Sequence, residues 1–137
     1  MSEVNKVLVL RGWEEIVNQK NLDAFDEFYA ADAVHHEPDQ DLQGLEEVKQ
    51  YIAMYFEAFP DMSVSVEDLI AEGDKVVSRY AYLGTHQGEL QGIAPTNKHI
   101  EKEGITIHRI EGGKIVEEWE QYDKLSFLQQ LGAAPER

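Results

Sequence analysis

The apolar residues of the first 60 positions recur at the spacing of amphipathic helices. One apolar stripe runs through residues 3–19, and a second follows Asn21, a residue type that caps helix N-termini. A third stripe begins at residue 44 and stops before Pro60. We therefore predict helices over residues 3–19, 21–30 and 44–58.

The rest of the chain follows the period of two that half-buried strands show. A short strand at residues 33–38, stopped by Pro38, lies between the second and third helices. Four further strands are predicted before and after a glycine-rich loop at 87–97, at residues 62–71, 76–86, 98–110 and 114–122. Gly112 and Gly113 mark a two-residue hairpin between the last two strands, and a final helix covers 124–131.

Helices followed by successive strands with short turns are typical of the α+β class. We predict one domain over residues 1–137: a cone-shaped, curved antiparallel sheet wrapped by three N-terminal helices, with a short C-terminal helix. A chain of this length buries roughly two-thirds of its unfolded surface, which is enough for a real core. A curved sheet with helices on one side encloses an interior pocket.

Acidic residues outnumber basic ones by 27 to 12, which gives a net charge of −15. Such a surface repels nucleic acid and anionic membranes and argues against a highly anionic substrate. There are no cysteines, so disulfides, thiol nucleophiles and thiolate metal sites are excluded. The chain shows neither an apolar run long enough to span a membrane nor signal-peptide features, so we expect a cytoplasmic protein with no membrane partner.

Regular pairing outward from a Gly112–Gly113 turn would set His108 opposite Glu117 and Thr106 opposite Trp119. Alternation then gathers five side chains on one face: Thr106, His108, Trp119, Gln121 and Asp123. The opposite face carries Ile105, Ile107, Val116, Glu118, Glu120 and Tyr122. The first set joins an imidazole, an indole, an amide and a carboxylate, a mixture typical of a ligand pocket with a few convergent polar groups.

Asp123 is the candidate acid/base of this set. A carboxylate beside Trp119 in an apolar cavity would be desolvated, which raises its pKa and suits it to remove a proton next to a carbonyl. His108 could then donate to the developing enolate oxygen. Structural roles remain open for all three: Asp123 can cap the last helix, His108 can pair with Glu117, and Trp119 can belong to the core.

Glu37 is a second candidate carboxylate, because Pro38 fixes the chain beside it and gives the side chain a defined direction. An ordinary surface carboxylate is the alternative. His35 and His36 are adjacent and point to opposite faces of their strand, so at most one of them enters a pocket. No histidine spacing matches a metal-binding motif, and we predict no metal site.

Four stretches carry a family resemblance: KNLDAFDEFYAADAVHHEP, FPDMSVSVEDLIAEGDKVVSRY, GTHQGELQGIAPTNKHIE and GGKIVEEWEQYDKLSFLQQLG. Over nearly its whole length the chain resembles the SnoaL-like polyketide cyclases of the nuclear transport factor 2-like superfamily. The resemblance implies an α+β cone, usually dimeric, with a deep apolar pocket. It also implies an intramolecular aldol ring closure without metal or cofactor.

The resemblance places the family's acid/base at Asp123, through the W-x-x-x-D pattern, and its histidine partner at His108. Ketosteroid-isomerase relatives place their base just before a proline, which corresponds to Glu37. Their oxyanion tyrosine matches Trp13 here, which offers only an indole N–H. Asn97 replaces a family glycine and tolerates positive φ. The expected substrate-binding residues are Trp13, His36, Tyr55, Phe59, Tyr80, Trp119 and Gln121.

We therefore expect a homodimeric, cofactor-independent enzyme, a lyase or cyclase, that acts on a neutral apolar carbonyl compound. The alternatives are a non-catalytic binder of small apolar molecules, an isomerase that uses Glu37, and an interaction module that uses the outer face of the sheet.

Overall fold

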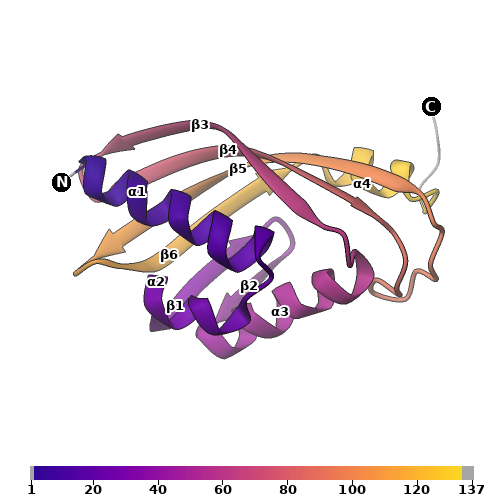
Figure 1. Ribbon diagram of the computed structural model, residues 1–137, viewed down its shortest axis with the longest axis horizontal. Coiled ribbons are helices and arrows are strands. Elements are labelled where there is room, and N and C mark those ends of the chain that lie inside the picture. Colours follow the sequence, from indigo (N-terminus) through magenta and orange to yellow (C-terminus); the bar gives the residue numbers. More distant parts are fainter. Residues whose placement is uncertain (1, 134–137) are drawn as a thin grey trace.

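The computed structural model describes residues 2–133, which form a strongly curved sheet with helices on its concave side (Figure 1). The first half contains α1 (Ser2–Gly12), a π-helical turn η1 (Trp13–Asn18), a 3₁₀ turn η2 (Leu22–Ala24), α2 (Phe25–Phe28), β1 (Tyr29–Glu37), β2 (Gln40–Gln43) and α3 (Leu45–Ala58). The second half contains β3 (Ser63–Glu72), β4 (Lys75–Thr85), β5 (His99–Glu111), β6 (Lys114–Tyr122) and α4 (Lys124–Gln130). The α+β class and the short C-terminal helix are confirmed.

The strands of the described residues form one sheet in the order β2-β1-β6-β5-β4-β3. Neighbouring strands are antiparallel except for β1 and β6, which run parallel. The expected all-antiparallel sheet is therefore corrected to a mixed one. The parallel pair matters for function, because it sets the first strand of the chain directly beside the last.

The N-terminal segments differ in detail from the sequence prediction. The predicted helix at 3–19 changes at Trp13 into a π-helical turn, in which Ile16 and Val17 are both buried. The second helix ends at Phe28 because Tyr29 already pairs with Ile115 of β6, so β1 begins four residues earlier than predicted. The predicted cap at Asn21 is confirmed, since its side chain accepts from the Asp23 N–H.

The third helix follows its apolar spacing closely. In α3, Leu45, Val48 and Tyr55 are buried toward the sheet. Glu46 and Glu47 lie in the first turn, where the helix dipole favours negative charge. The helix ends at Ala58, two residues before Pro60, as predicted.

The β5–β6 hairpin contains a bulge that regular pairing does not anticipate. Gly112 and Gly113 have φ values of +58° and +77°, and Glu111 pairs with Lys114, so the predicted turn is confirmed. Beyond it the ladder joins Ile110 to Ile115 but Arg109 to Glu117, which leaves Val116 as an extra residue. A one-residue shift exchanges the two faces of a strand, so the predicted faces of β6 are wrong. His108 lies opposite Glu118, and Thr106 opposite Glu120.

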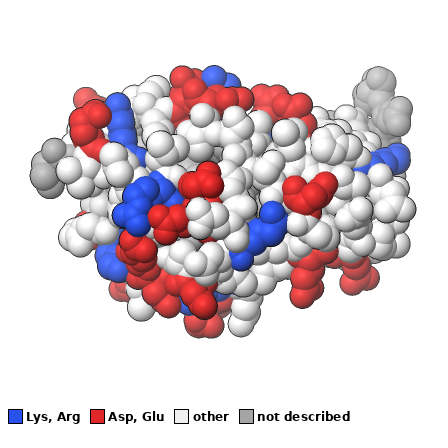
Figure 2. Space-filling view, viewed as in Figure 1, with Lys and Arg blue, Asp and Glu red and all other residues white. Residues whose placement is uncertain are grey.

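Most charged residues lie on the surface, and apolar residues fill the core. Acidic side chains are scattered over the face seen in Figure 2 and do not gather in one tail. The core is rich in aromatic residues, and Phe25, Phe28, Phe59 and Tyr80 are almost completely buried. No helix within residues 2–133 is long and apolar enough to cross a membrane.

Candidate functional site

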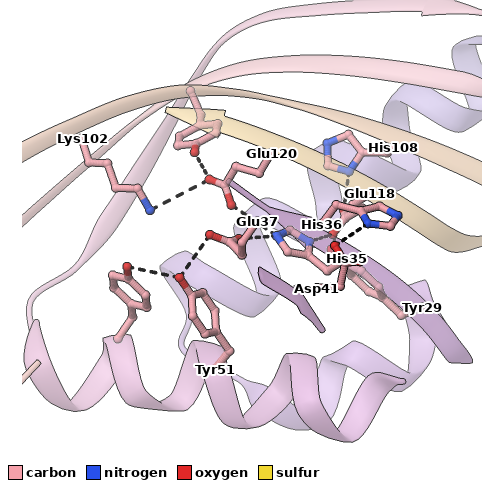
Figure 3. A network of polar contacts seen from close by, with 12 residues as sticks. Tyr29, His35, His36, Glu37, Asp41, Tyr51, Lys102, His108, Glu118 and Glu120 are labelled. Carbon is pink, nitrogen blue, oxygen red and sulfur yellow. Dashed lines mark hydrogen bonds and ion pairs between the residues drawn. The ribbon is translucent and has the colours of Figure 1, made fainter. Parts of the chain in front are cut away.

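Four ionisable side chains converge inside the cone from the strands that the bulge aligns (Figure 3). Alternation along β6 turns Glu118 and Glu120 inward, and both are buried. The parallel pairing with β1 brings His35 beside Glu118, and the antiparallel pairing with β5 brings His108 opposite the same residue. The interior of the sheet therefore holds a buried acid/base network.

His35 is the centre of this network. Its Nδ1 lies 2.8 Å from Glu118 Oε1, and its Nε2 lies 2.5 Å from Glu37 Oε2 and 3.3 Å from Glu120 Oε1. Burial opposes a charge on the ring, but hydrogen bonds to Glu118, Glu120 and Glu37 outweigh it and hold the pKa of His35 well above its usual value. Both ring nitrogens then carry protons, and His35 is a buried imidazolium.

Glu118 lies between two histidines and is held as a carboxylate. Its Oε2 lies 2.5 Å from His108 Nδ1 and accepts from the Tyr29 hydroxyl at 2.7 Å. Burial would raise the pKa of Glu118, but His108 and His35 together lower it. The group is ionised and fully hydrogen-bonded, which suits it to position the histidines.

His108 also contacts Ser78, at 2.8 Å between Nε2 and Oγ, so Ser78, His108 and Glu118 are linked in the order of a nucleophilic triad. Ser78 is completely buried, and its Oγ accepts from the Trp13 indole N–H at 3.2 Å. It is not among the residues that line the cavity. We therefore interpret Ser78 as a partner that orients His108, not as a nucleophile.

Glu37 and Glu120 flank His35 Nε2 and differ in charge. Glu37 accepts from the Tyr51 hydroxyl at 3.1 Å, and Glu120 accepts from the Tyr80 hydroxyl. Burial opposes ionisation of Glu37, but His35 and Glu120 outweigh it and lower its pKa to about 2. Burial, together with the neighbouring Glu37, raises the pKa of Glu120 to about 8. At neutral pH the pair therefore consists of one carboxylate and one carboxylic acid.

A cavity of about 50 Å³ adjoins this network. Its walls are mostly apolar side chains from α1, η1 and α3, and its polar lining groups include His35, His108, Glu118 and Glu120. Glu37 lies behind His35 and is not among the lining residues. The volume suffices for a few water molecules.

Ligand atoms of His35, Glu37 and Glu120 lie within 4.8 Å of one another, a spacing that could also surround a cation. Their charges are already matched inside the network, however. His35 Nε2 lies at hydrogen-bond distance from Glu37, Tyr80 donates to Glu120, and the ammonium of Lys102 lies 4.0 Å from Glu120 Oε2. We therefore interpret the cluster as a proton-holding set.

Four predicted site residues lie outside the cone. Asp123 is exposed, and its Oδ1 accepts from the Ser126 N–H at 2.9 Å, so the helix-cap alternative is confirmed. Gln121 is exposed, and Trp119 stacks on His36 on the outer face of the sheet. Their predicted placement in the pocket is wrong, because the bulge exchanges the faces of β6 and because His35, not His36, points inward. A catalytic role for Asp123 remains a prediction.

The other predicted site residues lie in the interior. His108 and Trp13 line the cavity. Tyr55, Phe59 and Tyr80 belong to the buried core around it. Glu37 is buried, so it is not the ordinary surface carboxylate that was the alternative. Asn97 has a φ of +59°, as expected where the family has glycine.

The sequence reasoning missed His35, Glu118, Glu120 and Lys102. Adjacency limited the pocket to one of His35 and His36 but did not decide between them. Glu118 and Glu120 were placed on the opposite face by the regular register. Their spacing gave no signal, because glutamates two residues apart also occur on solvated strand faces, as Glu101 and Glu103 do on β5.

The arrangement of helices and sheet has close counterparts among solved structures. A Catenulispora acidiphila protein described as having a ketosteroid isomerase-like fold shares it with a TM-score of 0.75 at 20% identity, over 93% of each chain. At that identity the likeness concerns the fold alone. It places the protein in the ketosteroid isomerase-like, or nuclear transport factor 2-like, fold class.

The family is shown by sequence. The model of the SnoaL-like polyketide cyclases matches residues 7–131, so the chain belongs to that family. A structure from Jannaschia sp. CCS1, described as a SnoaL-like polyketide cyclase, has a TM-score of 0.90 at 25% identity and covers 98% of this chain and 95% of its own.

Two Streptomyces structures are also similar. IdmH of Streptomyces antibioticus, described as a polyketide cyclase, is 31% identical, with a TM-score of 0.77 over 90% of this chain and 95% of its own. AclR of Streptomyces galilaeus, described as a hydroxylase, is 27% identical, with a TM-score of 0.88 over 99% of this chain and 89% of its own. No protein of curated function matches the chain. Relatives with the same fold are therefore described as catalysing different reactions, so the function of this protein is inferred from the residues of its site.

Proposed function

We propose that this protein is an acid–base enzyme that acts on a neutral, largely apolar carbonyl compound, in a cyclase- or isomerase-type reaction inside the cone. The observation that carries the proposal is the pair of unlike glutamates around His35, of which Glu120 faces the cavity. A catalytic acid/base works best when its pKa is close to the working pH. Glu120, with a pKa raised to about 8, is the cavity-lining carboxyl that meets this condition.

The reaction follows from these charges. With a pKa of about 8, roughly a tenth of Glu120 is ionised at pH 7, and this carboxylate takes a proton from the carbon next to the substrate carbonyl, whose oxygen becomes an enolate oxygen. The imidazolium of His35, held by Glu118 and Glu37, supplies positive charge beside that enolate. The enolate carbon then attacks a second carbonyl, which closes a ring, or takes the proton back at another carbon, which isomerises the substrate.

The residues that line the cavity indicate the class of substrate. They are mostly apolar, and the remaining surface is acidic, so a neutral compound is favoured over an anion. A substrate larger than a few waters requires the cavity to widen, and we assign this movement to α1 and η1. In α1, Val4, Val7 and Leu10 face solvent, and only Val9 and Gly12 are buried.

Hydrogen–deuterium exchange at the carbons next to the carbonyl of cyclohexanone tests the proton transfer, with NMR as the readout. Wild-type protein is expected to accelerate exchange, and Glu120→Gln to lose at least about 10²-fold of that acceleration. Asp123→Asn serves as the control, because it keeps a capping side chain and lies outside the cavity. Full exchange by Glu120→Gln, or loss of exchange by Asp123→Asn alone, would contradict the proposal in favour of the original Asp123 assignment.

Non-catalytic binding of a small apolar molecule is the second candidate, supported by the apolar walls of the cavity. Saturable binding of cyclohexanone with no acceleration of exchange by wild-type protein would favour this function.

A further inference from the structure

Lys102 is a buried cation at the edge of the acid–base network, and the proposed proton transfer assigns it no step. It lies on β5, and its side chain is 6% exposed. Its Nζ lies 3.8 Å from the centre of the Tyr122 ring and within 5.7 Å of three more ring centres, those of Tyr55, Tyr82 and Phe127. The closest carboxylate oxygen, Glu120 Oε2, is 4.0 Å away, so within residues 2–133 the ammonium has ring faces but no hydrogen-bond acceptor.

Other lysines of the protein are satisfied in the ordinary way. Lys124 pairs with Asp39, and Lys114 donates to the carbonyl oxygens of Asp26 and Glu27. For Lys102, burial outweighs the attraction of Glu37 and lowers the pKa to about 8. At pH 7 roughly a tenth of such an amine is neutral, roughly two hundred times the fraction for a lysine with an ordinary pKa of about 10.4.

Lys102 also stands between two spaces. Its neighbours Glu120 and Tyr82 line the interior cavity. The ammonium therefore lies beside the interior cavity, next to two of the side chains that line it. Lys102 also borders a surface hollow of about 470 Å³, which is lined by its exposed neighbours Glu101 and Glu103 together with Asp123, Ser126 and Gln130.

We propose that Lys102 is an imine-forming site for small, neutral aldehydes and ketones. The location of the amine, its lack of a hydrogen-bond acceptor and the carboxyl group beside it carry this inference. The aromatic rings that now stabilise the ammonium would enclose the carbon chain of the bound carbonyl compound.

The steps balance without an outside reactant. The Nζ lone pair forms a bond to the carbonyl carbon, the C=O π bond breaks, and a proton moves from nitrogen to oxygen to give a carbinolamine. The carbinolamine hydroxyl takes a proton from the Glu120 carboxyl and leaves as water, while the nitrogen lone pair forms the C=N bond of an iminium. The iminium cation and the Glu120 carboxylate then form an ion pair in place of the neutral amine and the acid.

This inference shares the carbonyl substrate class of the proposed function and rests on it to that extent. Its test is separate, because trapping of the imine requires no turnover. Wild-type protein is incubated with propanal and cyanoborohydride at pH 7, and the propylated lysines are located and quantified by peptide mass mapping. Lys102 is expected to be labelled at least about tenfold faster than Lys124, because the lowered pKa of Lys102 leaves more of its amine neutral than in an ordinary lysine.

Two further measurements separate chemistry from mere accessibility. The labelling rate of Lys102 should rise with pH as the ammonium loses its proton and should level off above about pH 8. Glu120→Gln, which removes the acid for loss of water, should slow labelling of Lys102 several-fold and leave Lys124 unchanged. Preferential labelling of Lys124, or a Lys102 that remains unlabelled, would overturn the proposal, whatever the result of the deuterium exchange on cyclohexanone.

Discussion

His35 and His36 are adjacent, and each is held by carboxylates, but they occupy opposite faces of β1. His36 Nδ1 lies 2.8 Å from Asp41, and its Nε2 lies 2.7 Å from Glu117. His35 has equally short contacts to Glu118 and Glu37. The two sites differ in the exposure of their partners: the side chain of Asp41 is 55% exposed, and that of Glu118 is 4% exposed.

The comparison shows how burial turns the same pairing into a different kind of site. On the outer face, hydrogen bonds to Glu117 and Asp41 raise the pKa of His36, but water screens the charges. On the inner face the side chains are buried, so bulk water screens little and each charge depends on its partner. Only there are two glutamates driven to opposite protonation states. The contacts of His36 with Asp41 and Glu117 are therefore ordinary surface ion pairs. The buried groups around His35 hold protons that an exposed site would release.

The largest expected difference is in stability. His35→Gln removes the cation between three buried carboxyl groups and is expected to cost about 3–5 kcal/mol in the free energy of unfolding, measured by urea denaturation at pH 7. His36→Gln is the matched control at the next position and is expected to cost about 1 kcal/mol or less. Equal losses in the two variants would mean that the inner network is as solvated as the outer one.

A second difference is expected in the pH dependence of stability. The pKa of Glu120 rises from 4.5 to about 8 on folding, so between those values the folded state holds a proton that the unfolded state has released. Stability from this group is present below pH 4.5 and is lost as the pH rises through 8. His35, whose pKa is also raised, adds a loss in the same direction above pH 6.5.

Urea denaturation at pH 5, 6, 7 and 8 measures this slope. Glu120→Gln should reduce the fall in stability by up to about 1.4 kcal/mol per pH unit. Glu117→Gln on the outer face is the control. The pKa of Glu117 is lowered by His36 and Arg109, so its contribution changes only below pH 4.5. A wild-type slope that survives in Glu120→Gln would show that this carboxyl is not the buried acid.

The sequence predicted the elements better than their faces, and the bulge explains why. The Gly112–Gly113 turn, the α3 stripe and the opposed directions of His35 and His36 follow from local rules, which the structure confirms. Val116 adds one residue that no local signal announces, and everything beyond it on β6 changes face. The site is built on β6. Because the prediction lacked this one-residue shift, it placed Trp119 and Asp123 in the pocket, where the structure has Glu118 and Glu120.

Lys102 was missed for a different reason. A lysine that alternates with Glu101 and Glu103 has the pattern of a solvated strand, and its burial depends on aromatic rings that come from α3, β4 and the C-terminal part of the chain. Long-range packing of this kind leaves no periodic signal.

The smallest expected effect belongs to Asp123, the residue that the family pattern favoured. Its side chain caps α4 from the outside of the cone, so Asp123→Ala should cost about 1 kcal/mol in the free energy of unfolding, and Asp123→Asn clearly less. Both variants should retain the exchange activity that Glu120→Gln loses, because the cap and the cavity share no side chain. Thermal unfolding and deuterium exchange on the same samples separate the two roles. If Asp123→Asn keeps its stability but loses exchange, Asp123 takes part in the chemistry from the surface hollow that it shares with Lys102, and the inner network serves only to support the sheet.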